Sequence, residues 1–190
     1  MNAPRILIAG IGNVFLNDDG FGVEVAQRLA TRSLPAGVRV ADFGIRGLDL
    51  AFALCEGCSA AILIDAAPRG GEPGTIYIMQ LVPPAADPGG AVAAELDAHG
   101  MDPLRVLRLA ASLGSIPDTL YLVGCEPERL VPCENGTLQV GLSPRVSAAV
   151  EEAAAAVERL VQRIITQAPG VRPAPTTTPL PIEPPCTNSR

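Results

Sequence analysis

The chain has few aromatic side chains, a single histidine and no cluster of basic residues. These shortages limit what its core is made of and which partners it can bind. Aromatic residues make up 3% of the 190 residues and hydrophobic residues 48%, so we expect one core built from Leu, Val, Ile and Ala. The formal net charge of -6 argues against nucleic acid or an anionic membrane surface as the main partner. No apolar run is long enough to cross a bilayer.

The cysteines indicate a reducing environment. Their number, five, is odd in a chain long enough to bury a proper core, which is more typical of reduced thiols than of a disulfide framework. The amino terminus runs straight into a predicted strand without a charged leader, so we expect a cytoplasmic protein. Cys55 and Cys58 have the spacing of a redox or zinc half-site, but no second such pair follows and they lie late in a predicted helix. We interpret them as incidental.

Apolar runs and helical periodicities alternate along the chain. Strands are predicted at 6–8, 38–43, 60–65, 74–80 and 119–124, and helices at 20–32, 48–54, 103–113 and from 144 to at least 164. The alternation predicts an α/β fold class: a three-layer sandwich with a mostly parallel, twisted sheet of about five strands and helices on both faces. We expect a single domain over residues 1–167, followed by a disordered tail at 168–190 that is rich in Pro and Thr.

The first strand leads directly into two carboxylates. Gly10 and Gly12 let the chain leave the sheet sharply, so Asp18 and Asp19 arrive over the carboxyl edge, where ligands bind in open α/β sheets. An Asp at this place also commonly caps the helix that follows. Since one helix needs one cap, the second carboxylate is left for another task.

Two more residues occupy the same kind of place. Asp65 ends the second plain apolar run, and His99 lies just before the helix that Asp102 and Pro103 begin. A doubly wound sheet would bring Asp18 or Asp19 together with these two side chains in one crevice. Two carboxylates and one imidazole suit nickel, manganese, iron or zinc. The competing interpretation is a solvated turn-forming aspartate and a surface histidine without a role.

Other motifs in the same stretch are weaker. Gly10-Ile-Gly12 resembles the start of a dinucleotide fingerprint, but the third glycine that should open a helix is missing, so no bound cofactor of that kind is expected. Asn17-Asp-Asp-Gly20 is similar to the metal-binding tetrad of the stationary-phase survival nucleotidase and phosphatase family, where the tetrad follows the first strand directly. The sequence contains no HExxH motif, and a Ser-His or Cys-His enzyme would have to use His99.

Three matches make the chain resemble the hydrogenase maturation proteases. The segment GIGNVFLNDDGFG from Gly10 to Gly22 is similar to the opening motif of that family, 62–66 to its central strand with the terminal Asp, and 97–99 to its histidine loop. The resemblance covers about residues 5–167 and implies a single α/β peptidase domain. It also implies that Asp19, Asp65 and His99 bind nickel and that Asp42 is a further acidic residue near the site.

The resemblance implies an endopeptidase that recognises nickel in the large-subunit precursor of a [NiFe]-hydrogenase and removes its C-terminal extension. The nickel would be supplied by the precursor, and Asp42 would orient the attacking water because the other two acids hold metal. Gly44 and Gly47 are candidate substrate-binding residues in a turn where many members carry a glycine-and-threonine sequence, so the precursor remains open. The alternatives are a metal-dependent phosphatase and a non-catalytic metal-delivery module.

Overall fold

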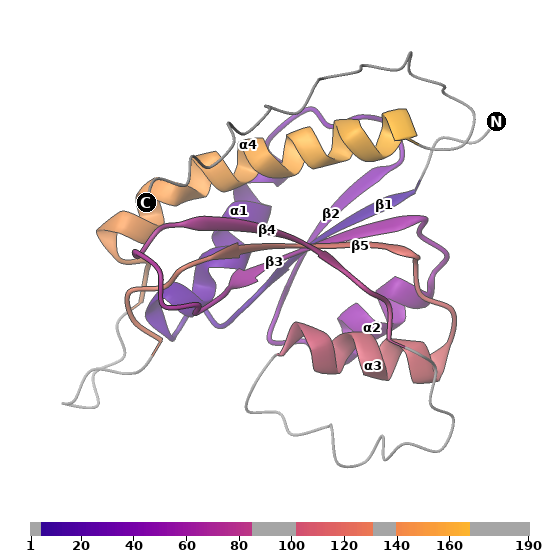
Figure 1. Ribbon diagram of the computed structural model, residues 1–190, viewed down its shortest axis with the longest axis horizontal. Helices are drawn as coiled ribbons and strands as arrows, with labels where there is room; N and C mark the ends of the chain where they lie inside the picture. Colours follow the sequence, from indigo (N-terminus) through magenta and orange to yellow (C-terminus); the bar gives the residue numbers. More distant parts are fainter. Residues whose placement is uncertain (1–4, 85–101, 131–139, 168–190) are drawn as a thin grey trace, which may run out of the picture.

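One five-stranded sheet forms the centre of the molecule (Figure 1). The computed structural model describes residues 5–84, 102–130 and 140–167. The strand order is β2-β1-β3-β5-β4, and the strands are β1 (Ile6–Ile11), β2 (Val38–Gly44), β3 (Ala60–Ala66), β4 (Ile76–Leu81) and β5 (Thr119–Cys125). β4 pairs antiparallel with β5, and the other pairs are parallel. The prediction of a mostly parallel sheet of about five strands is therefore confirmed.

The order of the strands follows their hydropathy. The unbroken apolar runs of β1 and β3 are buried almost throughout and occupy the middle of the sheet, where both faces are covered. β2 and β4 mix exposed and half-buried positions and form the two edges. The irregular pattern of an edge strand reflects contact with water on one side.

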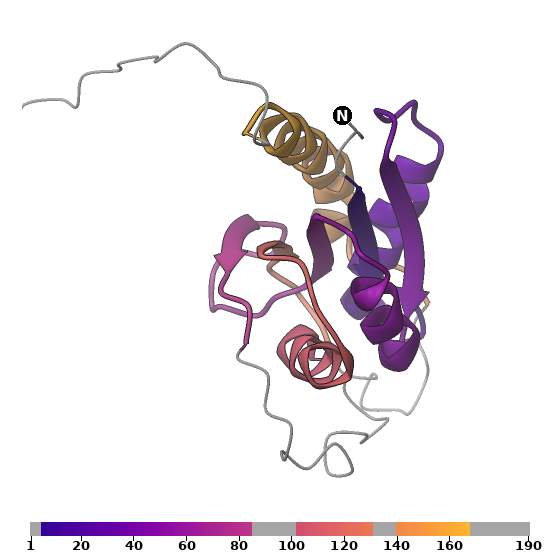
Figure 2. The same cartoon turned by 90° about the vertical axis from the view of Figure 1, so that its right-hand side faces the viewer.

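Helices cover both faces of the sheet, as the three-layer prediction requires. They are η1, a 3-10 turn (Asn17–Gly20), α1 (Phe21–Ala30), α2 (Gly47–Cys55), α3 (Pro103–Leu113) and α4 (Pro144–Gln167). α1 and α4 lie on one face, and α2 and α3 lie on the other (Figures 1 and 2). Each face has its own cluster of buried apolar side chains.

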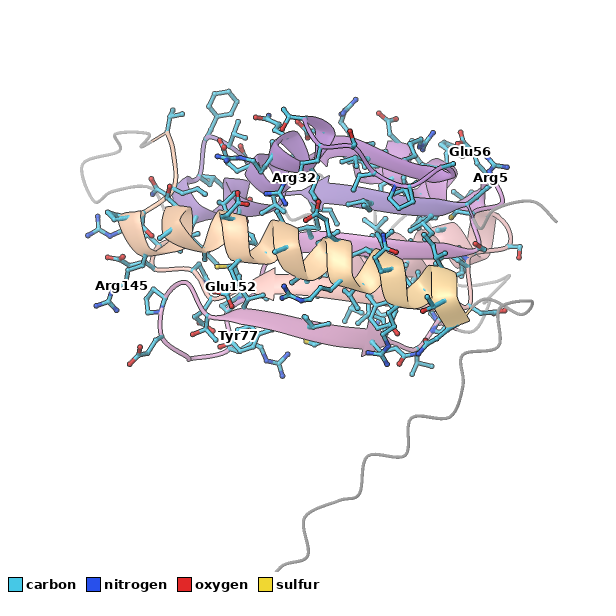
Figure 3. All side chains as sticks on the ribbon, turned by 90° about the horizontal axis from the view of Figure 1, so that it is seen from above. Arg5, Arg32, Glu56, Tyr77, Arg145 and Glu152 are labelled. Atoms are coloured by element: carbon cyan, nitrogen blue, oxygen red, sulfur yellow. The ribbon has the colours of Figure 1, made fainter. Side chains whose placement is uncertain are left out.

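The two ends of the sheet are easily told apart. In Figure 3, Arg5 and Glu56 lie at one end of the molecule, and Arg145, at the start of α4, lies at the other. Arg5 immediately precedes β1, so its end is the amino edge of the parallel strands, and the start of α4 marks the carboxyl edge. Among the described residues, no helix has both the length and the hydropathy needed to span a membrane.

The first helix departs from its predicted bounds. The sequence predicts one helix over 20–32, whereas the structure has a short 3-10 turn followed by an α-helix that ends at Ala30. The extra turn brings residues 17–20 over the sheet before α1 begins. The proposed tail at 168–190 lies outside the described residues, and the domain boundary stays a prediction.

Glycines determine how closely α1 approaches the sheet. A Cβ on Gly22 would lie 2.0 Å from the carbonyl oxygen of Ile64 in β3 and 2.4 Å from that of Ile11 in β1. A Cβ on Gly10 would lie 2.4 Å from the carbonyl oxygen of Gly22. Backbone touches backbone here, so no other residue type fits without displacing the helix.

We expect Gly22→Ala to lower the free energy of unfolding by about 3 kcal/mol, because the added methyl group meets main-chain atoms that cannot rotate away. Chemical denaturation measures the loss. Gly114→Ala is the matched control, since its Cβ would come no closer than 3.4 Å to a neighbour, the Cys55 sulfur. A loss in Gly22→Ala no larger than in this control would contradict the packing argument.

Candidate functional site

Asp65 stands at the carboxyl end of the central strand β3. Its neighbour in β5 is Gly124, and the residue as a whole is only 8% exposed. Its Oδ1 accepts a hydrogen bond of 2.8 Å from the N–H of Ala66. The ladder fixes its backbone, so the carboxylate has a defined place at the edge of the sheet.

Asp19 reaches the same edge from the 3-10 turn η1. Its Oδ2 accepts a 2.7 Å hydrogen bond from the N–H of Asn13, which closes the turn between β1 and η1. Gly12 makes this turn possible: its φ is +125°, and a Cβ there would lie 1.7 Å from the carbonyl oxygen of Asp19. The glycines of this stretch thus allow the turn that brings the Asp19 carboxylate to the carboxyl edge of the sheet.

The charges of these two acids act on each other. Burial raises the pKa of Asp65 well above its usual range, and the nearby Asp19 charge raises it further, while the Ala66 N–H lowers it and Asp102 adds a smaller rise. The pKa of Asp19 is also raised, by burial, against the opposing effect of the hydrogen bond from Asn13. Two close carboxylates that resist ionisation together are stabilised by a proton or by a cation.

Asp18 does a different task from its neighbour. It is fully buried, and its two oxygens accept three backbone N–H groups, from Glu128 at 2.8 Å, Arg129 at 2.9 Å and Ser143 at 2.6 Å. The sequence expectation that one aspartate caps α1 is wrong. The N-cap position is Gly20, and no side chain caps this helix. Of the two candidates left open by the residue pattern, Asp19, which the resemblance favours, is the one whose charge acts on Asp65.

The same geometry argues against the phosphatase interpretation of Asn17-Asp-Asp-Gly20. Asp18 is consumed by backbone hydrogen bonds, and Asn17 is only 5% exposed. A metal ion at this tetrad would therefore find a single available carboxylate, that of Asp19.

The third member of the predicted nickel set, His99, lies outside the described residues. The description resumes at Asp102, which caps α3 as predicted by accepting a 2.9 Å hydrogen bond from the N–H of Leu104. The Asp102 charge also contributes to the raised pKa of Asp65. No group of three His, Cys, Asp or Glu that could hold a metal occurs among the residues the structure describes. Asp19 and Asp65 are two carboxylates whose oxygens would suit a hard or borderline divalent ion.

Asp42 and Gly44 lie at the end of the edge strand β2, and Gly47 lies just after the turn that follows it. Asp42 is an exposed residue of β2 opposite Gly10, and its main-chain carbonyl accepts a hydrogen bond from the Arg46 guanidinium. The carbonyl of Gly44 accepts a 3.0 Å hydrogen bond from the N–H of Gly12, and Gly47 begins α2. These contacts join the end of β2 to the turn that carries Asp19.

Sequence reasoning missed Glu126, which follows β5 directly. This residue is 5% exposed and accepts hydrogen bonds from the N–H groups of Arg69 and Gly70 and, at 2.8 Å, from the Tyr77 hydroxyl. Burial would raise the pKa of Glu126, but these donors outweigh it and the pKa is lowered. The sequence did offer a signal for Glu126, because an acidic residue stands just past the end of a predicted strand there, as Asp65 stands at the end of another.

The paired cysteines have no link to this edge. Cys55 and Cys58 are free thiols whose pKa values are raised, chiefly by burial. The Sγ atoms donate to backbone carbonyls, that of Ala110 at 3.4 Å and that of Leu54 at 3.6 Å. Raised pKa values keep both thiols protonated and unreactive, which supports their interpretation as incidental.

The fold and the site define a class: a doubly wound α/β protein with a half-buried and a buried carboxylate, Asp19 and Asp65, at its carboxyl edge. The sequence profile of a family described as hydrogenase maturation protease matches residues 23–160. The chain therefore belongs to the hydrogenase maturation protease family, and it is a hydrolase of the endopeptidase type.

Individual relatives agree with this assignment. A hydrogenase expression/formation protein HupD of Rhodobacter capsulatus is 35% identical over 150 residues, which are 78% of this chain and 69% of that protein. The hydrogenase 2 maturation protease of Escherichia coli is 30% identical over 78% of this chain and 85% of its own length.

Solved structures support the same fold. The hydrogenase maturating endopeptidase HybD of E. coli matches with a TM-score of 0.63 and 27% identity, over 84% of this chain and 93% of that one. A hydrogenase 2 maturation peptidase from a Thaumarchaeota archaeon matches with a TM-score of 0.61 and 29% identity, over 83% and 98% of the two chains.

We expect Asp65→Asn to stabilise the metal-free protein at neutral pH, because it removes a buried charge that burial and Asp19 both disfavour. The raised pKa means that between its ordinary value and the folded value the native state binds more protons than the unfolded state. The wild type should therefore lose stability as pH rises through that window, by about 1.4 kcal/mol for each pH step of one. The gain in Asp65→Asn should shrink as pH falls toward the ordinary value.

Denaturation curves at several pH values, in the presence of a chelator, measure this difference. Asp118→Asn is the control, since Asp118 is an exposed acid just before β5 at the opposite edge. It should change stability by no more than about 0.5 kcal/mol. A less stable Asp65→Asn protein at neutral pH would show that the carboxylate is favourably paired instead.

Proposed function

We propose that this endopeptidase recognises nickel in the large-subunit precursor of a [NiFe]-hydrogenase and removes the precursor's C-terminal extension. The observation that carries the proposal is the meeting of Asp19 and Asp65 at the carboxyl edge, in a chain that belongs to the maturation protease family. The nickel ion is part of the substrate in this reaction, and the acid pair is the place where the enzyme inspects it.

The donor set explains why nickel would be inspected and not retained. Asp19 and Asp65 contribute carboxylate oxygens, and His99 would contribute an imidazole, so the set holds no thiolate. An ion held by these three groups alone keeps open positions and moderate affinity, which ligands from the precursor would complete. Cation binding would also offset the burial and the Asp19 charge that raise the pKa of Asp65, so occupancy by a nickel-bearing precursor is favoured electrostatically.

Asp42 is our choice for the group that orients the attacking water. It is exposed on the edge strand, and its Oδ1 lies 3.7 Å from the position that a Cβ on Gly44 would occupy. The carboxylate thus lies next to Gly44, and because Gly44 has no side chain, a substrate backbone could approach the carboxylate there. A positioned acid or base of this kind typically contributes ~10² to 10⁴ in rate.

The surface beside Gly44 and Gly47 suits a protein substrate. Ile45 is 60% exposed, Leu48 46% and Phe52 53%, although all three are large apolar side chains. Leu48 and Phe52 are four residues apart on α2, so they share one face of the helix. Exposed apolar side chains next to a site mark a contact surface, and here the contact surface would serve the precursor. The free thiols of Cys55, Cys58 and Cys125 fit our placement of the reaction in the cytoplasm.

The decisive experiment mixes the purified protein with a hydrogenase large-subunit precursor, prepared with and without nickel. Cleavage of one bond near the precursor's carboxyl terminus, in the nickel-loaded form only, is the expected result, followed by mass spectrometry. Release of phosphate from a phosphate ester would instead identify the phosphatase, and binding of the precursor without cleavage would identify the metal-delivery module. Equal cleavage of both precursor forms would refute nickel inspection.

Two substitutions separate binding from hydrolysis. Asp42→Asn should bind the nickel-loaded precursor normally but cleave it ~10² to 10⁴ times more slowly, since the metal ligands remain and the group that orients water is lost. Asp65→Asn should fail at the binding step. Single-turnover cleavage and a pull-down assay distinguish the two, with Asp118→Asn as the unaffected control. Normal cleavage by Asp42→Asn would make Asp42 a structural residue.

A further inference from the structure

The turn that carries Asp19 is anchored less directly than the strand that carries Asp65. Asp65 is paired with β5 through the backbone of β3, but Asp19 belongs to a four-residue 3-10 turn that has no side-chain cap at its start. The place of Asp19 at the carboxyl edge therefore depends on contacts between this turn and the rest of the fold.

Asp18 supplies contacts of the right kind and in the right place. Successive residues of a 3-10 helix differ in direction by about 120°, so the Asp18 and Asp19 side chains leave the turn toward different partners. The Asp18 carboxylate accepts the N–H groups of Glu128, Arg129 and Ser143 at 2.6–2.9 Å. Its own N–H donates to the Arg129 carbonyl at 3.3 Å.

These partners come from well-anchored parts of the fold. Glu128 and Arg129 follow β5, and Ser143 precedes the 24-residue helix α4, which packs against α1. Hydrogen bonds from backbone N–H groups to a fully buried carboxylate are among the stronger ones in proteins, because the acceptor is ionised and no water competes. Four hydrogen bonds therefore tie the turn to two other segments of the carboxyl edge.

We propose that Asp18 is a positioning residue that holds Asp19 against Asp65, and so keeps the acid pair ready for the nickel-bearing precursor. The inference rests on the proposed function for its consequence in binding. The restraint itself is a property of the fold, and it can be tested without any precursor.

The first test needs no precursor. In Asp18→Asn the amide hydrogens of Glu128, Arg129 and Ser143 should exchange with solvent faster, by roughly fivefold for a hydrogen bond worth about 1 kcal/mol. The amide of Asn13, which donates to Asp19, should also exchange faster, because the turn is no longer held in place. The amides of Arg69 and Gly70, which donate to Glu126, are the internal reference for any general loss of stability. No acceleration at Asn13 relative to that reference would overturn the proposal.

The second test measures how Asp18→Asn binds the nickel-loaded precursor. In Asp18→Asn one carboxylate oxygen becomes an NH₂ group that faces a backbone N–H, so at least one of the three hydrogen bonds is replaced by a contact between donors. Loss of a partner that orients a ligand typically weakens a metal site by 10- to 100-fold, and we expect that loss in affinity for the nickel-loaded precursor with little change in single-turnover rate once bound. The folded fraction is measured in parallel by thermal unfolding.

Glu126→Gln is the matched control, because Glu126 is also a buried carboxylate held by backbone N–H groups, but its donors belong to Arg69, Gly70 and Tyr77 and not to the partners of Asp18. It should lose stability yet bind the precursor within about twofold of the wild type. The double variant Asp18→Asn/Asp19→Asn should bind no worse than Asp19→Asn alone. Full additivity in that double variant, or normal binding by Asp18→Asn, would show that Asp18 is merely structural. Failure of the wild type to cleave any nickel-loaded precursor would refute the proposed function and leave the exchange result standing.

Discussion

The close contact between the first helix and the two central strands is the constraint on which the rest of this structure depends. Gly22 lies where a Cβ would come within 2.0 Å of a carbonyl oxygen of β3, and Gly12 turns the chain with a φ of +125°. The turn follows this packing and contacts β3. The position of Asp19 therefore depends on backbone packing as well as on the charged side chains around it.

The number of hydrogen-bond donors around each carboxylate divides the acids of the carboxyl edge into two kinds. Asp18 accepts three backbone N–H groups, and Glu126 accepts two backbone N–H groups and a tyrosine hydroxyl. Asp19 and Asp65 each accept one backbone N–H, and the pKa of each is raised. Within the described residues, Asp18 and Glu126 thus hold loops in place, whereas Asp19 and Asp65 have fewer donors, as the site we propose requires.

The raised pKa of Asp65 carries a cost in stability that fits the transient metal site we propose. A buried carboxylate with the Asp19 charge nearby destabilises the folded protein when it is ionised, and the same electrostatics favour a partner that brings a cation. Under the proposed function, ligands too few to retain the ion would let the enzyme release its product after one inspection. The edge strand β2, with Asp42 and the apolar side chains at the start of α2, would then offer contacts to a protein substrate beyond the metal.

The sequence alone determined the elements and the positions of the acids. The apolar runs at Ile6 and Ala60 were long enough to identify central strands, and the strand ends placed Asp19 and Asp65 at one edge, because parallel strands share a carboxyl end. The residue pattern did not determine which of Asp18 and Asp19 belongs to the proposed site, and only the family resemblance selected Asp19, since both follow the same turn and either would serve as a helix cap in isolation. Tertiary structure decided that question: the partners of Asp18 lie 110 to 125 residues further along the chain, and local sequence carries no information about hydrogen bonds across such a distance. The strand order and the anchoring role of Glu126 were decided in the same way, because they depend on which distant segments pack together and not on the pattern within any one of them.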